Sequence, residues 1–301
     1  MTPSLEDLPR PRTARPLGAI DARGSSQACI EMLSILYYAE KAALDAFERL
    51  SDPTIVENCE IFLEAQPMLL ADESSHLKDI QEIISLLGGD GIQPRAPGFS
   101  ELWDLSLLRR KILFPLQARV AALFTLVTES LGYAYLYHLA DATSQVDQKI
   151  SSLLRANVRD EERHIRVSMD VLRATLKHSR IAAIWDLTFH FWVFLLLSRR
   201  AARTMFSTLA RVGFDPYVVA GSSLDFTCSL LRKVAEEKLG RSISLRLLTA
   251  MSPYFFSPRM MRLLEGLCLV PEPPFIWPTL RGFAGMMRRI PPTSLETTRE
   301  F

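Results

Sequence analysis

The chain has 301 residues, of which 48% are apolar, and a formal net charge of +1. This length and composition predict one domain with a large apolar core. The near-neutral charge gives no electrostatic case for nucleic acid as a partner. The cysteines form no Cys-x-x-Cys pair, which argues against a disulfide scaffold or a zinc ribbon and favours a reducing compartment. No secretory hydrophobic region stands near the N-terminus, so we expect a cytoplasmic location.

The chain divides into a leader, a helical region and a tail. Residues 1–25 are rich in Pro, Arg and Gly without periodicity, which predicts a disordered leader. Residues 26–270 show apolar positions at helical spacing and no convincing strand pattern, so this region is predicted to be all-α. A Pro-rich tail fills residues 271–301. The expected helices are 26–50, 54–87 (bent near Pro67), 102–140 (bent near Pro115), 146–177, 181–211, 215–239 and 242–268.

Two of these helices carry the same short motif. It reads Asp-Glu-Ser-Ser-His at residues 72–76 and Asp-Glu-Glu-Arg-His at residues 160–164. A Glu and a His three residues apart lie on one face of a helix, one turn apart. The repeated motif therefore supplies half of the side chains that a two-metal site needs.

The other half is predicted on the two helices that precede the motifs. Glu40 and Glu129 each lie in the middle of an apolar stripe, 33 residues before Glu73 and 32 residues before Glu161. One Glu on each of two helices and Glu-x-x-His on two others is the pattern of ferritin-like four-helix bundles that hold two metal ions. Since buried unpaired carboxylates are costly, converging acids call for cations. The predicted metal ligands and catalytic residues are Glu40, Glu73, His76, Glu129, Glu161 and His164; the alternative is a set of surface ion pairs.

Several neighbours are expected to support these ligands. A metal-bound imidazole usually donates its second N–H to a carboxylate, so the pseudo-symmetry predicts that Asp160 orients His76 and that Asp72 orients His164. The alternative is that both aspartates are solvated. Tyr37 and Tyr133 lie one turn from the lone glutamates and either meet the ligands or, as the favoured alternative, pack in the core.

The donor set indicates the metal and the chemistry. Four carboxylates and two imidazoles suit two iron ions, or a manganese–iron pair, better than zinc alone. More than a hundred residues follow the second motif, and extra helices favour a substrate pocket and an O₂-activating oxygenase. The alternatives are a ferroxidase or peroxide scavenger, and a helical protein that binds no metal.

Residues 181–198 form an apolar segment that touches the lower length limit of a membrane span. Asp186 and His190 interrupt it, so we expect a buried or interfacial helix and no membrane partner. This segment either walls a substrate channel or belongs to the core, and the sequence does not separate the two.

Residues 157–165, Asn-Val-Arg-Asp-Glu-Glu-Arg-His-Ile, resemble the fourth-helix signature of the p-aminobenzoate N-oxygenase family of di-iron enzymes. Gly-Phe-Asp-Pro at residues 213–216 resembles the C-terminal region of the same family, and the resemblance covers roughly residues 30–240. The Asp-Glu-x-Arg-His core is shared with acyl-carrier-protein desaturases and other ferritin-like oxygenases. The resemblance implies a homodimer that oxygenates a small organic molecule with O₂ and a separate electron donor, often an arylamine in secondary metabolism. By position it implies the same six ligands.

Asn157 departs from that family's pattern, which has a further His ligand one turn before the fourth-helix Glu. An amide oxygen is a much poorer iron ligand than an imidazole. N-oxygenation, C-hydroxylation and desaturase-type oxidation of an acyl substrate are therefore all left open.

Overall fold

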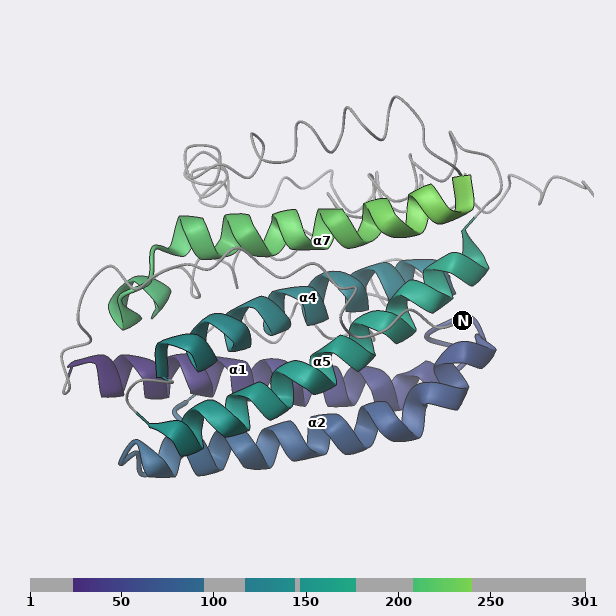
Figure 1. Cartoon of the computed structure of the whole chain (residues 1–301). Helices are drawn as coiled ribbons and strands as arrows, with labels where there is room; N and C mark the ends of the chain where they lie inside the picture. Colours follow the sequence, from purple (N-terminus) through teal and green to yellow (C-terminus); the bar gives the residue numbers. More distant parts are fainter. Residues whose placement is uncertain (1–23, 95–116, 144–146, 177–207, 240–301) are drawn as a thin grey trace, which may run out of the picture.

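The computed structural model describes residues 24–94, 117–143, 147–176 and 208–239. These residues form helices and no strand, which confirms the all-α prediction for the described part (Figure 1). The predicted leader up to residue 23, the tail 271–301, the helix 242–268 and the apolar segment 181–198 lie outside the described residues, as do residues 102–116.

The first helical pair is α1 (Gly24–Glu48), extended by the short 3₁₀ helix η2 (Arg49–Ser51), and α2 (Glu60–Leu86). The expected start of α2 near residue 54 is wrong, because residues 53–55 form a turn and residues 56–59 are not helical. The Asp52 carboxylate accepts a hydrogen bond from the Thr54 N–H at 2.8 Å, and the Asp52 carbonyl accepts from Ile55 and Val56. An Asp side chain that bonds the backbone two residues on stabilises a turn in competition with a helix.

The second pair is α4 (Ala118–Thr143) and α5 (Gln148–Thr175). The Asp147 carboxylate caps α5 by accepting hydrogen bonds from the N–H groups of Lys149 and Ile150, which fixes the start of the motif helix. A third element, α7 (Pro216–Leu239), begins with Pro at its first position, where the missing N–H costs least.

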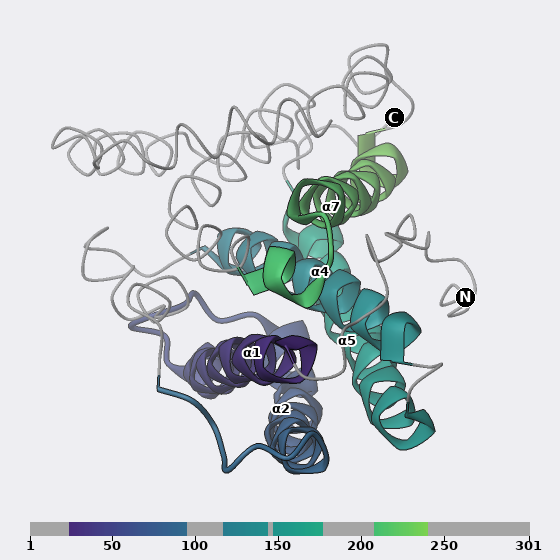
Figure 2. The same cartoon turned by 90° about the vertical axis from the view of Figure 1, so that its left-hand side faces the viewer.

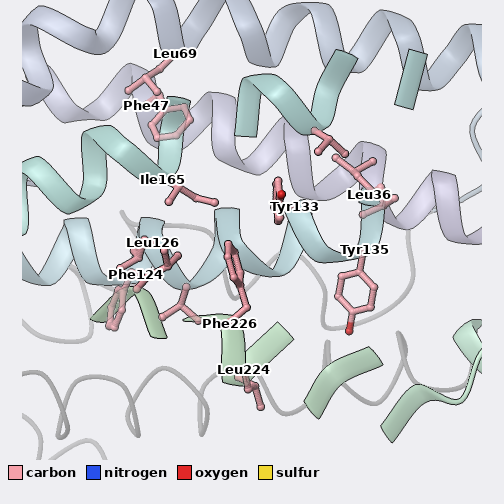
Figure 3. Packing of buried hydrophobic residues seen from close by; sticks show 14 of the residues in the cluster. Leu36, Phe47, Leu69, Phe124, Leu126, Tyr133, Tyr135, Ile165, Leu224 and Phe226 are labelled. Carbon is pink, nitrogen blue, oxygen red and sulfur yellow. The ribbon is translucent and has the colours of Figure 1, made fainter. Parts of the chain in front are cut away.

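The two pairs pack side by side, with α1 against α2, α4 against α5 and α2 against α5. Helix α7 packs on α4 and α5, and Figure 2 shows it on the side of α4 that faces away from α1 and α2. Phe47, Leu69, Ile165, Leu126 and Phe226 belong to one continuous apolar cluster that joins the layers (Figure 3).

Helix α4 is the one helix of the described part that is long and apolar enough to cross a membrane. Of its most apolar window, 72% is buried inside the protein. The core helix of a folded domain has the same length and composition, and burial in this molecule accounts for the apolar character of α4.

Candidate metal centre

All six predicted ligand side chains are buried between the two helical pairs. Each of the four helices contributes one carboxylate, and α2 and α5 add a histidine each. The residues are Glu40 (5% exposed) on α1, Glu73 and His76 (both 0%) on α2, Glu129 (5%) on α4, and Glu161 (1%) and His164 (0%) on α5.

Five of these six side chains, all except Glu161, form two triads that share Glu73. The first is Glu40, Glu73 and His76, and the second is Glu73, Glu129 and His164; within each triad, one possible ligand atom per residue lies within 4.8 Å of the others. The Nδ1 atom of His76 lies 3.3 Å from Glu40 Oε2, and that of His164 lies 3.1 Å from Glu129 Oε2. The geometry thus offers two neighbouring cation positions.

Two glutamates face both histidines. Glu73 Oε1 lies 3.2 Å from His164 Nδ1, while Oε2 lies 3.9 Å from His76 Nδ1. Glu161 does the same from the opposite helix, with Oε1 3.8 Å from His76 and Oε2 3.9 Å from His164. Glu73 and Glu161 therefore occupy the middle of the cluster, whereas Glu40 contacts only the first histidine and Glu129 only the second.

The second nitrogen of each histidine points out of the cluster toward an aspartate. His76 Nε2 lies 3.4 Å from Asp160 Oδ2, and His164 Nε2 lies 3.2 Å from Asp72 Oδ2. These are the partners that the pseudo-symmetry of the sequence predicts. A proton donated from Nε2 to the aspartate leaves the Nδ1 lone pair directed at the carboxylates, which is the tautomer that a metal ligand requires.

Arg163 joins the two aspartates, a role that sequence reasoning missed. Its Nη2 atom donates to Asp72 Oδ1 at 2.8 Å and contacts Asp160 Oδ1 at 2.7 Å, so one guanidinium links both histidine–aspartate pairs. The available signal was the residue before each motif histidine, which is Arg163 in the second motif but Ser75 in the first. Because the first motif has Ser75 at the corresponding position, Arg163 contacts both aspartates.

Burial and charge strongly perturb the titration of the cluster. Burial and the neighbouring charge of Glu40 raise the pKa of Glu73 well above its ordinary value, and burial with Glu129 does the same to the pKa of Glu161. Burial by itself lowers the pKa of His76, but hydrogen bonds with Asp160 and Glu40 outweigh it and raise that pKa to about 10.

Several buried polar atoms in and beside the cluster have no hydrogen-bond partner. These atoms indicate whether the cluster is suited to bind a cation. They are both oxygens of Glu73, Oε2 of Glu161 and both amide atoms of Asn157. Glu73 Oε1 is close to His164, but the contact lacks hydrogen-bond geometry. Buried carboxylate oxygens without donors are strongly disfavoured. Cations between the two triads would satisfy the glutamate oxygens, so the donor set fits metal ions.

The tyrosines expected near the ligands direct their hydroxyls elsewhere. The Tyr37 hydroxyl accepts a hydrogen bond from Gln81 at 3.5 Å, and the Tyr133 hydroxyl donates one to Glu162 at 3.4 Å. The ring of Phe47 instead packs edge-on against His164, with centroids 5.6 Å apart. The wall of the cluster beside His164 is therefore apolar.

Comparison of the chain with protein-family models, with curated proteins and with solved structures gives no match. The function is therefore inferred from the site itself.

Proposed function

We propose that this protein is a ferritin-like di-iron enzyme that uses O₂ to oxidise a small organic substrate. The observation that carries the proposal is the pair of buried Glu–Glu–His triads that share Glu73. Four helices that each contribute a carboxylate, two of them also a histidine, match the di-metal four-helix bundle.

The roles of the ligands follow from their positions. Glu73 and Glu161, which face both histidines, would help to hold both ions, whereas Glu40 and Glu129 would each help to hold one. His76 and His164 would bind through Nδ1 because Nε2 is held by an aspartate. Oxygen-rich donors with two imidazoles favour iron, or manganese with iron, over softer metals.

Two such ions would supply the electrons and the O₂ chemistry, and the protein would supply geometry and a dry surrounding. The aspartates hold the imidazoles in one orientation, and Phe47 covers one edge of His164. These contacts pre-organise the site before any metal binds.

Oxidation of an organic substrate is preferred to iron storage for two reasons. The sequence resembles oxygenases at residues 157–165, and the chain continues past α5 into α7 and beyond, which exceeds what a simple iron-oxidising bundle needs. The proposal includes a homodimer and a separate electron donor. It leaves open N-oxygenation, C-hydroxylation and desaturation, because Asn157 is not a histidine.

The experiment begins with metal-free protein reconstituted anaerobically with ferrous iron. We expect two iron ions per chain by elemental analysis, and a loss of bound iron in Glu73→Gln and Glu161→Gln. The matched control is Glu162→Gln, which changes the neighbouring acid that bonds Tyr133 and should keep both ions. A wild-type protein that binds no iron or manganese would overturn the metal centre.

Catalysis is tested by O₂ uptake in the presence of a chemical reductant and a panel of arylamines, aromatic hydrocarbons and acyl thioesters. An oxygenase consumes O₂ over many turnovers and gives a product with added oxygen or a new double bond, which mass spectrometry detects. O₂ uptake that stops when the added ferrous iron is oxidised, with no organic product, identifies a ferroxidase instead.

A further inference from the structure

The two cation positions of the metal centre are not equivalent. The repeated motif relates them, but the side chains around His164 are held closer together and more firmly than those around His76. We propose, on the basis of the di-metal function proposed above, that the two positions fill in a fixed order. The His164 position, formed by Glu73, Glu129 and His164, binds its ion first and more tightly, and the His76 position, beside Glu40 and His76, is filled second.

Two carboxylate oxygens lie close to the Nδ1 atom of His164. Glu129 Oε2 lies 3.1 Å from this atom, and Glu73 Oε1 lies 3.2 Å from it. Two ligand atoms that bind one ion at about 2.1 Å and at right angles to each other are about 3 Å apart. Both carboxylates therefore already have the spacing from the imidazole that a shared cation requires.

The carboxylates of the His76 position do not have this spacing. Glu40 Oε2 lies 3.3 Å from His76 Nδ1, but the next oxygens are those of Glu161 at 3.8 Å and Glu73 at 3.9 Å. Glu73 or Glu161 has to move before three ligands can surround an ion beside His76. Because such rearrangement costs binding free energy, the ion at this position should bind more weakly.

The contacts behind the two histidines differ in the same direction. Asp72 accepts hydrogen bonds from Nε and Nη2 of Arg163, at 3.3 and 2.8 Å, and lies 3.2 Å from His164 Nε2. Asp160 contacts one guanidinium nitrogen, Nη2, at 2.7 Å and lies 3.4 Å from His76 Nε2. A carboxylate that is held by two N–H groups is fixed in orientation as well as in position. Asp72 should therefore orient His164 more firmly than Asp160 orients His76.

The ring of Phe47 restricts His164 further. Phe47 is 2% exposed, packs edge-on against His164 with ring centroids 5.6 Å apart, and belongs to the apolar cluster in Figure 3. Because a closely packed imidazole has few alternative rotamers, binding an ion to it requires little further ordering. The supply of metal would thus control whether one or both positions are occupied, and two different metals could be bound in sequence.

The test is titration of the full-length, metal-free protein with Co²⁺, followed by visible absorption. Glu40→Gln and Glu129→Gln form a matched pair, because both acids are 5% exposed and each lies beside one histidine. Glu129→Gln should weaken the first binding step by about tenfold or more, since loss of a ligand should cost at least as much as loss of a ligand's outer partner. Glu40→Gln should leave the first step unchanged and weaken the second step.

A second measurement identifies the position that fills first without depending on either variant. Repulsion between two cations weakens the second binding step in any two-metal site, so the presence of two steps alone does not identify the tighter position. Crystals of the wild-type protein grown with one equivalent of Co²⁺ should show anomalous scattering beside His164.

A signal beside His76, or equal signals beside both histidines, overturns the proposed order of filling. Equal weakening of the first step in Glu40→Gln and Glu129→Gln overturns it as well. These results leave the di-metal function in place. A wild-type protein that binds neither Co²⁺ nor iron overturns the metal centre itself, and the order of filling with it.

Discussion

Arg163 should govern the affinity of the metal centre although it is not one of the six predicted ligands. Its guanidinium contacts Asp72 at 2.8 Å and Asp160 at 2.7 Å, and those carboxylates hold His164 and His76. Arg163→Gln removes the positive charge that neutralises two partly buried aspartates. Both imidazoles are then less firmly oriented.

The expected loss of stability in Arg163→Gln follows from the strength of these hydrogen bonds and from the exposure of the Arg163 side chain. A hydrogen bond to a charged group contributes about 1.5–3 kcal/mol when it is buried. The Arg163 side chain is 42% exposed, so solvent screening reduces the total loss of stability to about 1–2 kcal/mol. Loss of the carboxylate that binds a metal-bound histidine typically weakens metal binding about 10–100-fold. Arg163 supports two such carboxylates, so we expect Arg163→Gln to weaken Co²⁺ binding by about tenfold, the lower end of this range.

The assay is titration of metal-free protein with Co²⁺, followed by visible absorption, alongside urea unfolding. Arg173→Gln is the matched control because Arg173 lies on the same helix and joins Glu237 on α7 to Asp170, at 2.6 Å from each. It should lose similar stability and bind Co²⁺ like the wild type. Wild-type Co²⁺ affinity in Arg163→Gln, or an equal loss in Arg173→Gln, would refute the reasoning.

Three further predictions concern Asn157, Gly132 and His138. Asn157→Leu should raise the stability of the metal-free protein by about 1 kcal/mol in urea unfolding, because it removes two buried amide atoms without partners; a loss of stability would contradict this. Gly132→Ala should stabilise α4 by about 0.5–1 kcal/mol, since the new Cβ would lie 3.7 Å from Glu161 Oε1, an ordinary contact. The iron content of Gly132→Ala should equal that of the wild type. A lower iron content would show that the metal centre needs the space beside Glu161. Burial lowers the pKa of His138 from 6.5 to about 4, so the folded state keeps its imidazole neutral while the unfolded state takes up a proton. The stability from His138 is complete above pH 6.5 and falls as the pH drops toward 4, by up to about 3 kcal/mol. Unfolding between these pH values should therefore show a smaller drop in His138→Gln than in the wild type.

The sequence by itself determined the helical class and the set of residues to examine. Helical spacing places Glu73 with His76, and Glu161 with His164, on single helix faces, because 3.6 residues complete a turn. The apolar neighbours of Glu40 and Glu129 predict that these acids face inward, and both are 5% exposed. The helix face of each residue follows from local periodicity, so it can be predicted without knowledge of tertiary contacts.

The spacing of apolar residues did not predict the start of α2. The apolar pattern continues through Ile55 and Val56, but Asp52 accepts hydrogen bonds from the backbone N–H groups of residues 54–56 and holds residues 53–55 in a turn. A side chain that competes with helical hydrogen bonds leaves little trace in a hydrophobic pattern.

Only the tertiary structure decided which atoms meet. Periodicity gives the face of a helix but neither the rotation of one helix against another nor the rotamer of a side chain. The central positions of Glu73 and Glu161, the turning of the Tyr37 and Tyr133 hydroxyls away to other partners, and the single guanidinium of Arg163 between two aspartates depend on how α2 and α5 pack. Those contacts join residues up to 92 positions apart, and the geometry between such distant segments exists only once the helices are assembled.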